Sequence, residues 1–257
     1  MFINNFDPIA IQILSIEIRW YSLAYIFGIL LAWIYSKKIL IQEKNHSKLF
    51  DDFISYLIIG IILGGRLGYV FFYNFKYYLN NLIEIPMIWH GGMSFHGGLI
   101  GVIIATIIFS KKYKINKYIL LDLVSASAPI GIFLGRIANF INSELYGRPS
   151  DMPWSVIFQK IDSMPRHPSQ LYEAAFEGLI LFFIIFLFTK KKYLEKPGLI
   201  SSLFIIFYSI FRFFIEFYRE PDEHLNFIIL NLTMGQIICV IFLTIGFFLF
   251  YKKNEIK

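Results

Sequence analysis

Two arginines, each followed by a polar partner at helical spacing, are the residues of this sequence best suited to chemistry. Arg136 and Asn139 are three residues apart, so on a helix they share one face. Arg212 and Glu216 are four residues apart and can pair, which would hold the guanidinium in place. Because a guanidinium presents a planar fork of N–H donors, this pattern favours recognition of a phosphate. A helix-packing ion pair is the alternative interpretation of Arg212 and Glu216.

A histidine within a glycine-rich segment is the best candidate for a base. Four glycines fall within nine residues in the run His90-Gly91-Gly92-Met93-Ser94-Phe95-His96-Gly97-Gly98. Glycines let the backbone approach a ligand or another helix closely. His96, placed among them, can take up a proton near neutral pH. A buried, hydrogen-bonded histidine with a structural role is the alternative.

The elements that position these side chains follow from the composition. Apolar residues make up 57% of the 257 residues, charged residues only 16%, and the mean hydropathy is +0.61. This composition argues against a soluble enzyme, a disordered protein or a nucleic-acid binder, despite the net charge of +6. Runs of roughly 17–25 apolar residues predict membrane helices. We therefore expect an all-α membrane protein with seven transmembrane helices, at residues 20–36, 53–73, 93–110, 118–142, 173–189, 198–217 and 234–251.

The lysines orient this predicted bundle. Fifteen of the seventeen lysines fall in segments 37–50, 111–117, 190–197 and the tail after 251, which lie on one side if the seven spans alternate. Positively charged loops mark the cytoplasmic side. The sequence therefore predicts that the N-terminus lies outside and the C-terminus inside.

In that orientation the polar residues of the predicted spans gather at one level. Arg66, Arg136 and Arg212 all lie toward the outer ends of outward-running spans. A charged side chain in lipid costs about 2.5–3.5 kcal/mol, so these arginines must face one another, water or a polar ligand. We expect a phospholipid headgroup site that opens toward the outer leaflet. Residues 143–172, which contain four prolines, are expected to form a small extracytoplasmic cap on a single membrane domain, residues 1–257.

At residues 135–147 the sequence resembles the signature of bacterial prolipoprotein diacylglyceryl transferases. The run Gly-Arg-Ile-Ala-Asn-Phe-Ile-Asn-Ser-Glu-Leu-Tyr-Gly matches that signature at every fixed position. Other motifs of the family are matched by Ile18–Tyr21, Gly64–Tyr69, Ser94–Gly101, Arg166–Glu173 and Phe211–Asp222. Ser22 stands where a glycine is common and His90 where an acidic residue can occur, and neither departure removes an expected site residue.

The resemblance implies an enzyme of the bacterial inner membrane with its active site on the periplasmic side. It would transfer a diacylglyceryl group from phosphatidylglycerol to the lipobox cysteine thiol of a prolipoprotein signal peptide. A thioether forms and glycerol phosphate leaves. The expected partners are phosphatidylglycerol, prolipoproteins and membrane lipid, with no nucleic acid. No metal or cofactor is expected, and one cysteine, Cys239, gives no reason to propose a covalent enzyme intermediate.

Read with this resemblance, the candidate residues take specific roles. His96 would be the base that takes the thiol proton, and Arg212 would stabilise the leaving phosphate, with Glu216 orienting Arg212. Tyr21 would close the pocket or donate to a phosphate oxygen. The expected substrate-binding residues are Arg136, Asn139, Glu144, Gly147 and Arg66. Two alternatives stay open: Tyr21 as an interfacial aromatic anchor and Arg66 as a structural ion-pair member.

A transporter and a non-catalytic membrane scaffold are the rival functions. Transporter sites lie near the midplane, often between repeated halves. The absence of a repeat among the predicted spans and the bias of the polar residues to one side argue against a transporter. A scaffold would not need three arginines and a histidine at one depth.

Overall fold

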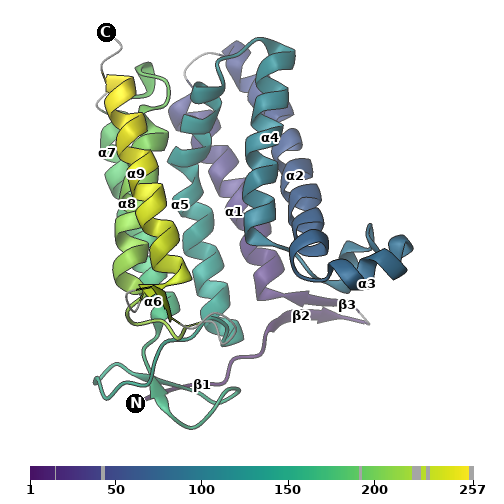
Figure 1. The fold of residues 1–257 in the computed structure, drawn as a ribbon, viewed down its shortest axis with the longest axis vertical. Coiled ribbons are helices and arrows are strands. Elements are labelled where there is room, and N and C mark those ends of the chain that lie inside the picture. The colour runs from purple at the N-terminus through teal and green to yellow at the C-terminus, as the bar shows by residue number, and fades with distance from the viewer. Residues whose placement is uncertain (15, 42–43, 191–192, 222–226, 230–231, 255–257) are drawn as a thin grey trace. The chain divides into compact units, whose positions relative to one another are not determined.

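The computed structural model describes residues 1–14, 16–41, 44–190, 193–221, 227–229 and 232–254 (Figure 1). The chain divides into two compact units, one built from residues 1–36 and 122–257 and the other from residues 37–121. Each unit is mostly helical, as the composition predicts. The expectation of a single membrane domain stays a prediction.

The first unit contains most of the candidate site. Its helices are α1 (Trp20–Tyr35), the larger part of α5 (Lys117–Asn142), α6 (Ser169–Glu173), α7 (Leu181–Lys190), α8 (Leu199–Ile215) and α9 (Met234–Asn254). A π-helical segment, Ala174–Ile180, joins α6 to α7 without a break. Helix α8 packs against both α7 and α9 (Figure 1). Its first turn is held by Asp122 of α5, whose carboxylate accepts hydrogen bonds from the backbone N–H groups of Gly198 at 2.6 Å and Ser201 at 2.8 Å.

The cap of the first unit is an ordered β structure. Strand β4 (Val156–Phe158) pairs in parallel with β1 (Phe2–Asn4) and antiparallel with β5 (Pro165–Arg166). The buried amide of Asn4 donates to the carbonyl of Phe140 at 2.6 Å, which ties the N-terminal strand to the end of α5. The cap therefore extends beyond the predicted 143–172 segment, because its sheet recruits the first residues of the chain. Two hairpins, β2 (Ile9–Ile13) with β3 (Ile16–Arg19) and β6 (Phe227–Ile229) with β7 (Leu232–Thr233), precede α1 and α9.

The second unit is organised around close packing of α2 (Lys44–Phe72) against α4 (Phe95–Tyr113). Gly60 and Gly64 of α2 face Gly97 and Gly101 of α4: a Cβ on Gly101 would lie 1.9 Å from the Gly60 carbonyl oxygen. Small residues at every fourth position let helix backbones touch in this way. Of the glycines in the His96 segment, Gly97 therefore serves helix packing, since a Cβ there would lie 2.3 Å from the Gly64 carbonyl oxygen. The short helix α3 (Phe75–Asn80) and the 3₁₀ turns Leu82–Glu84 and Ile88–His90 complete the unit.

Helices occupy all seven predicted spans in the described residues. Five are long and apolar enough to cross a membrane: Lys48–Phe72, Phe95–Tyr113, Lys117–Asn142, Ser169–Lys190 and Met234–Lys253. The apolar helices α1 and α8 are shorter, at 16 and 17 residues. An all-α membrane protein is supported, while the count of seven spans and their orientation stay predictions.

Candidate active site

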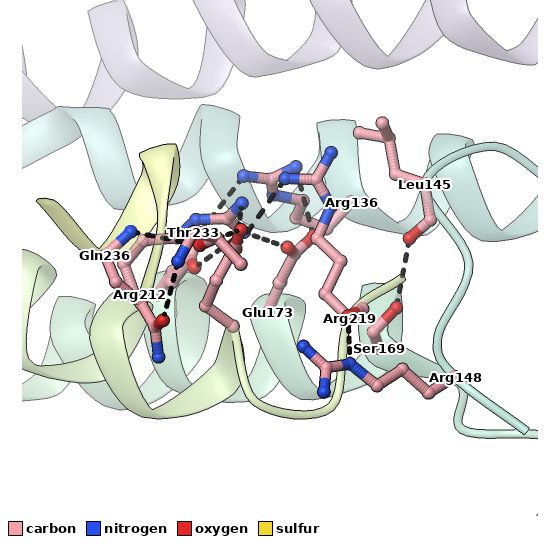
Figure 2. Close-up of polar contacts among 11 residues, drawn as sticks. Arg136, Leu145, Arg148, Ser169, Glu173, Arg212, Arg219, Thr233 and Gln236 are labelled. Carbon is pink, nitrogen blue, oxygen red and sulfur yellow. Dashed lines mark hydrogen bonds and ion pairs between the residues drawn. The ribbon is translucent and has the colours of Figure 1, made fainter. Parts of the chain in front are cut away.

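Arg212 lies at the centre of a buried ion network in the first unit (Figure 2). It projects from the last turn of α8, and its side chain is only 10% exposed. Its Nη2 lies 2.8 Å from the Glu216 carboxylate. Its Nη1 is in close contact with Glu173 of α6 and lies 3.5 Å from Glu177. The predicted pairing of Arg212 with Glu216 is therefore present, and two further carboxylates join it.

Arg136 reaches the same two carboxylates from α5. Its Nη1 lies 3.0 Å from Glu173 Oε2, and its Nη2 donates to Glu177 Oε2 at 3.2 Å. Glu173 and Glu177 are fully buried, whereas the Arg136 side chain keeps 18% of its surface exposed. The two arginines that the sequence singles out are thus brought together, and each carboxylate bridges both guanidinium groups. Arg136 is the more accessible of the two.

Glu216 is itself held from the start of α9. Thr233 Oγ1 donates to Glu216 Oε1 at 3.0 Å, and Arg219 Nη1 lies 3.7 Å from Glu216 Oε2. Thr233 is fixed by reciprocal bonds with Gln236: the Thr233 N–H donates to Gln236 Oε1, and the Gln236 N–H donates to Thr233 Oγ1. This arrangement resembles a helix capping box. The N-terminal turn of α9 therefore fixes the carboxylate that orients Arg212.

The network is close to charge balance. Three glutamates, at positions 173, 177 and 216, face three arginines, at positions 136, 212 and 219. Buried charges persist only when they are paired and hydrogen-bonded, because their desolvation is costly. An anion that enters this site must therefore compete with carboxylates that already contact the guanidinium groups.

Asn139 and Glu144 lie together at the end of α5. The side-chain amides of Asn139 and Asn142 donate to the two oxygens of the Glu144 carboxylate, at 3.0 and 3.2 Å. Glu144 is exposed, and its backbone carbonyl accepts a hydrogen bond from the Gln170 side chain at 2.6 Å. The two predicted residues are therefore joined, with the carboxylate held in a fixed position at an accessible surface.

Gly147 lies where three backbone segments meet. Its N–H donates to the His167 carbonyl at 3.1 Å, its carbonyl accepts from Arg166, and it forms a β-bridge with Arg219. A Cβ at this position would lie 2.3 Å from the His167 carbonyl oxygen, so only glycine fits. The structure thus gives Gly147 a packing role, and its predicted contact with substrate stays a prediction.

Two groups of the cap titrate away from their ordinary range. Hydrogen bonds from Arg166 lower the pKa of the Asp162 carboxyl. Partial burial lowers the pKa of His167, whose Nδ1 lies 3.1 Å from the Tyr172 hydroxyl. Both pKa shifts make the folded cap more stable at neutral pH than at acidic pH.

Tyr21 lies in the first turn of α1 and is partly buried. Its ring meets that of Tyr25 edge-on at 5.1 Å, and its hydroxyl is close enough to Glu144 and Arg136 to interact with their charges. The contacts place Tyr21 beside the candidate site, while its role in closing a pocket stays a prediction.

Arg66 and His96 belong to the second unit, and their arrangement relative to Arg136 and Arg212 stays a prediction. Arg66 is buried and donates to four backbone carbonyls, those of Glu84, Ile85, Gly91 and Gly92, with Tyr78 stacked 5.1 Å from its guanidinium. These contacts favour a structural role for Arg66. Its hydrogen-bond partners are backbone carbonyls, whereas the structural alternative expected an ion pair. Within the second unit, His96 is exposed in the first turn of α4, beside Phe95.

Sequence reasoning missed two central members of the network, Glu173 as an ion-pair partner and Glu177 altogether. A usable signal was present: Glu177 is a charged residue inside the predicted span 173–189, and it follows Glu173 by four residues. Two carboxylates at that spacing in an apolar segment require cationic partners. Arg219 follows Glu216 by three residues, a spacing that could also have indicated their contact, whereas Thr233 had no comparable local signal.

The chain is similar to known proteins over nearly its whole length. The family model described as prolipoprotein diacylglyceryl transferase matches residues 8–252. Relatives named phosphatidylglycerol–prolipoprotein diacylglyceryl transferase include one from Rickettsia felis, 52% identical over 253 residues that cover 97% of this chain and 98% of the relative. One from Rickettsia akari is 52% identical with the same coverage. One from Rickettsia typhi is 51% identical over 99% of this chain and 100% of the relative.

Proposed function

The chain belongs to the prolipoprotein diacylglyceryl transferase family, and from this membership we propose how its buried arginine pair serves the family's reaction. The chain is a multi-pass membrane enzyme of lipoprotein lipidation, which transfers the diacylglyceryl group of phosphatidylglycerol to a prolipoprotein. The finer assignments of acceptor thiol, membrane side and residue roles are our proposals.

The proposed acceptor is the thiol of the lipobox cysteine. Its sulfur attacks the glycerol carbon that carries the phosphate, a C–S bond forms, the C–O bond to phosphate breaks, and glycerol phosphate leaves with the electron pair. The thiol must lose its proton, and at an ordinary pKa of about 8.5 only a few per cent is thiolate at neutral pH. His96, exposed in the first turn of α4, is the proposed base.

The observation that carries the proposal is the convergence of Arg136 and Arg212 on one pair of buried carboxylates. Two guanidinium groups held this close offer several N–H donors to one phosphate. They would stabilise the negative charge that grows on the leaving group, and one preorganised donor of this kind is typically worth about 2.7–4 kcal/mol. Glu216 orients Arg212, and Asn139 with Glu144 shapes the headgroup site beside Tyr21.

We further propose that the site opens toward the outer leaflet of the bacterial inner membrane, with seven spans, the N-terminus outside and the C-terminus inside. The lysine distribution supports this orientation. The cap, which packs onto the end of α5 through Asn4 and Phe140, then faces the periplasm and is available to a signal peptide.

Purified full-length protein, mixed with phosphatidylglycerol in detergent and a peptide that carries a lipobox cysteine, tests the activity. We expect the peptide to gain the mass of one diacylglyceryl group as glycerol phosphate appears in equal amount. A peptide with the cysteine replaced by serine is the matched control and should gain nothing. Modification of the serine peptide, or glycerol phosphate release without peptide modification, would contradict the proposed acceptor.

A further inference from the structure

Glu177 contacts both proposed phosphate-binding arginines, although no step of the proposed reaction uses it. Its Oε2 accepts from Arg136 Nη2 at 3.2 Å, and its Oε1 lies 3.5 Å from Arg212 Nη1. The side chain is fully buried. Glu177 therefore occupies an N–H donor of Arg136 and lies within ion-pair distance of Arg212, the two guanidinium groups that a bound phosphate would need.

The two bridging carboxylates do not hold the arginines equally. Glu173 is in close contact with Arg212 and lies 3.0 Å from Arg136, so it is the tighter partner of both. Glu177 makes the longer contact with each arginine. Because charge-assisted hydrogen bonds are strongest when short, Glu177 is the carboxylate that an incoming anion displaces more easily.

The local backbone also sets Glu177 apart from Glu173. Glu177 lies within the π-helical segment Ala174–Ile180, whereas Glu173 ends the preceding α-helix. The next residue, Gly178, packs so closely on α5 that a Cβ would lie 2.7 Å from Phe133. Short π-helical insertions are rare and are found frequently at functional sites. Here the insertion brings Glu177 against Arg136 and Arg212.

The substrate and the product carry different negative charges, which suggests a role for the Glu177 carboxylate. Phosphatidylglycerol presents a phosphodiester with one negative charge, whereas glycerol phosphate is a monoester with a charge of about −1.5 to −2 near pH 7. An arginine pair without a competing anion would hold the more highly charged product more tightly than the substrate. Such a site would be inhibited by its own product.

We propose that Glu177 is a positioning residue that competes with the phosphate for Arg136 and Arg212. It withdraws from the arginines when phosphatidylglycerol binds, and it returns to them as glycerol phosphate leaves. This inference rests on the proposed function, because it assumes that the two arginines bind the phosphate.

The test compares Glu177→Gln with wild type in steady-state and single-turnover assays, with glycerol phosphate as the added inhibitor. Gln has nearly the volume of Glu but no charge. We expect inhibition by glycerol phosphate to become about tenfold tighter, because a charged competitor has been removed. The kcat should fall as product release slows, while the single-turnover rate stays within about twofold of wild type and the KM for phosphatidylglycerol does not rise.

Two further variants keep the test decisive. Glu177→Asp retains the charge but shortens the side chain by one methylene, so it should shift product inhibition in the same direction by less, and it replaces Glu177→Gln if that variant does not fold. Asp122→Asn is the matched control, since Asp122 is another buried carboxylate of the same unit but binds Gly198 and Ser201. It should leave product inhibition unchanged.

Failure of the inference and failure of the proposed function give different results. Wild-type turnover with normal product inhibition in Glu177→Gln and Glu177→Asp would overturn the role of Glu177 alone. A loss of single-turnover rate in Glu177→Gln, without tighter inhibition, would also overturn it and would point to a structural ion pair. If wild type itself transfers no diacylglyceryl group, the proposed function fails.

Discussion

The guanidinium of Arg212 lies 2.8 Å from the carboxylate of Glu216, one helical turn further along the chain. Both side chains are buried, and Glu216 is fixed in turn by Thr233 at the start of α9. This contact occupies Nη2 and directs Nη1 toward Glu173 and Glu177. The orientation of the candidate phosphate ligand is therefore set by two helices and not by one flexible side chain.

The orientation of the chain in the membrane can be tested by thiol labelling. Single cysteines replace Asn5 and Asn254 in a Cys239→Ser background, where the native thiol is buried. We expect an impermeant reagent to label position 5 in intact cells and position 254 only after the membrane is opened. Labelling of position 254 from outside would overturn both the orientation and the outer-leaflet site.

Arg66→Lys is predicted to affect stability more than catalysis. Arg66 donates to the carbonyls of Glu84, Ile85, Gly91 and Gly92, and a lysine ammonium cannot satisfy all four. The unpaired carbonyls should cost about 1–3 kcal/mol in the free energy of unfolding. Thermal unfolding in detergent measures this, with Arg19→Lys, an exposed arginine, as the control. Lost activity with unchanged stability would instead support a substrate contact for Arg66.

The cap is predicted to loosen as the pH falls. Burial lowers the pKa of His167 in the folded cap. As the pH falls below the ordinary histidine pKa of about 6.5, the unfolded chain takes up a proton that folded His167 does not yet accept. The folded cap therefore loses stability until the pH reaches the lowered pKa of His167. Arg166 lowers the pKa of Asp162, so that ion pair stabilises the cap above the ordinary pKa of aspartate and is lost as pH falls through the lowered value.

Amide hydrogen exchange at Gly147 and His167, corrected for the intrinsic effect of pH, measures this loosening. His167→Gln should remove the part of the pH dependence that lies just below neutrality, and Asp162→Asn the part at more acidic pH. Protection that stays constant with pH in wild type would show that neither group stabilises the cap.

The membrane-length helices and the contact between Arg212 and Glu216 could be predicted from the sequence. Apolar runs located every membrane-length helix in the described chain, and the four-residue spacing of Arg212 and Glu216 predicted their contact. Both predictions depend on the spacing of residues close together in the chain, which can be read from the sequence. The glycine-rich run likewise indicated close approach, which the structure provides as packing of Gly97 on Gly64.

The partners of Arg136 could not be read from spacing. Glu173 and Glu177 lie 37 and 41 residues further along the chain and meet Arg136 only because α5 packs beside the segment that holds them. The π-helical segment that positions Glu177 has no sequence signature of its own. The carbonyl partners of Arg66 are equally non-local, since they depend on the path of residues 84–92.

His96→Gln tests the proposed base. Gln keeps hydrogen bonding and approximate size but takes up no proton near neutral pH, so the single-turnover rate should fall by about 10²–10⁴-fold. Binding of phosphatidylglycerol should be nearly unchanged. Raising the pH toward the thiol pKa of about 8.5 should partly restore the rate, because more of the peptide is already thiolate. Equal rates at neutral pH, or a deficit that does not change with pH, would remove His96 from this role.

In the proposed reaction, Arg136 and Arg212 bind the phosphate whose departure the enzyme promotes. Arg136→Lys and Arg212→Lys keep the charge but lose the planar fork, so at position 212 a single ammonium would replace the two nitrogens that contact Glu216 and Glu173. The most direct measurement is the single-turnover rate of each folded variant with phosphatidylglycerol and a lipobox peptide. We predict a loss of about 10²–10³-fold in each variant. Wild-type rates in both variants would show that the two arginines do not bind the phosphate and have a packing role only.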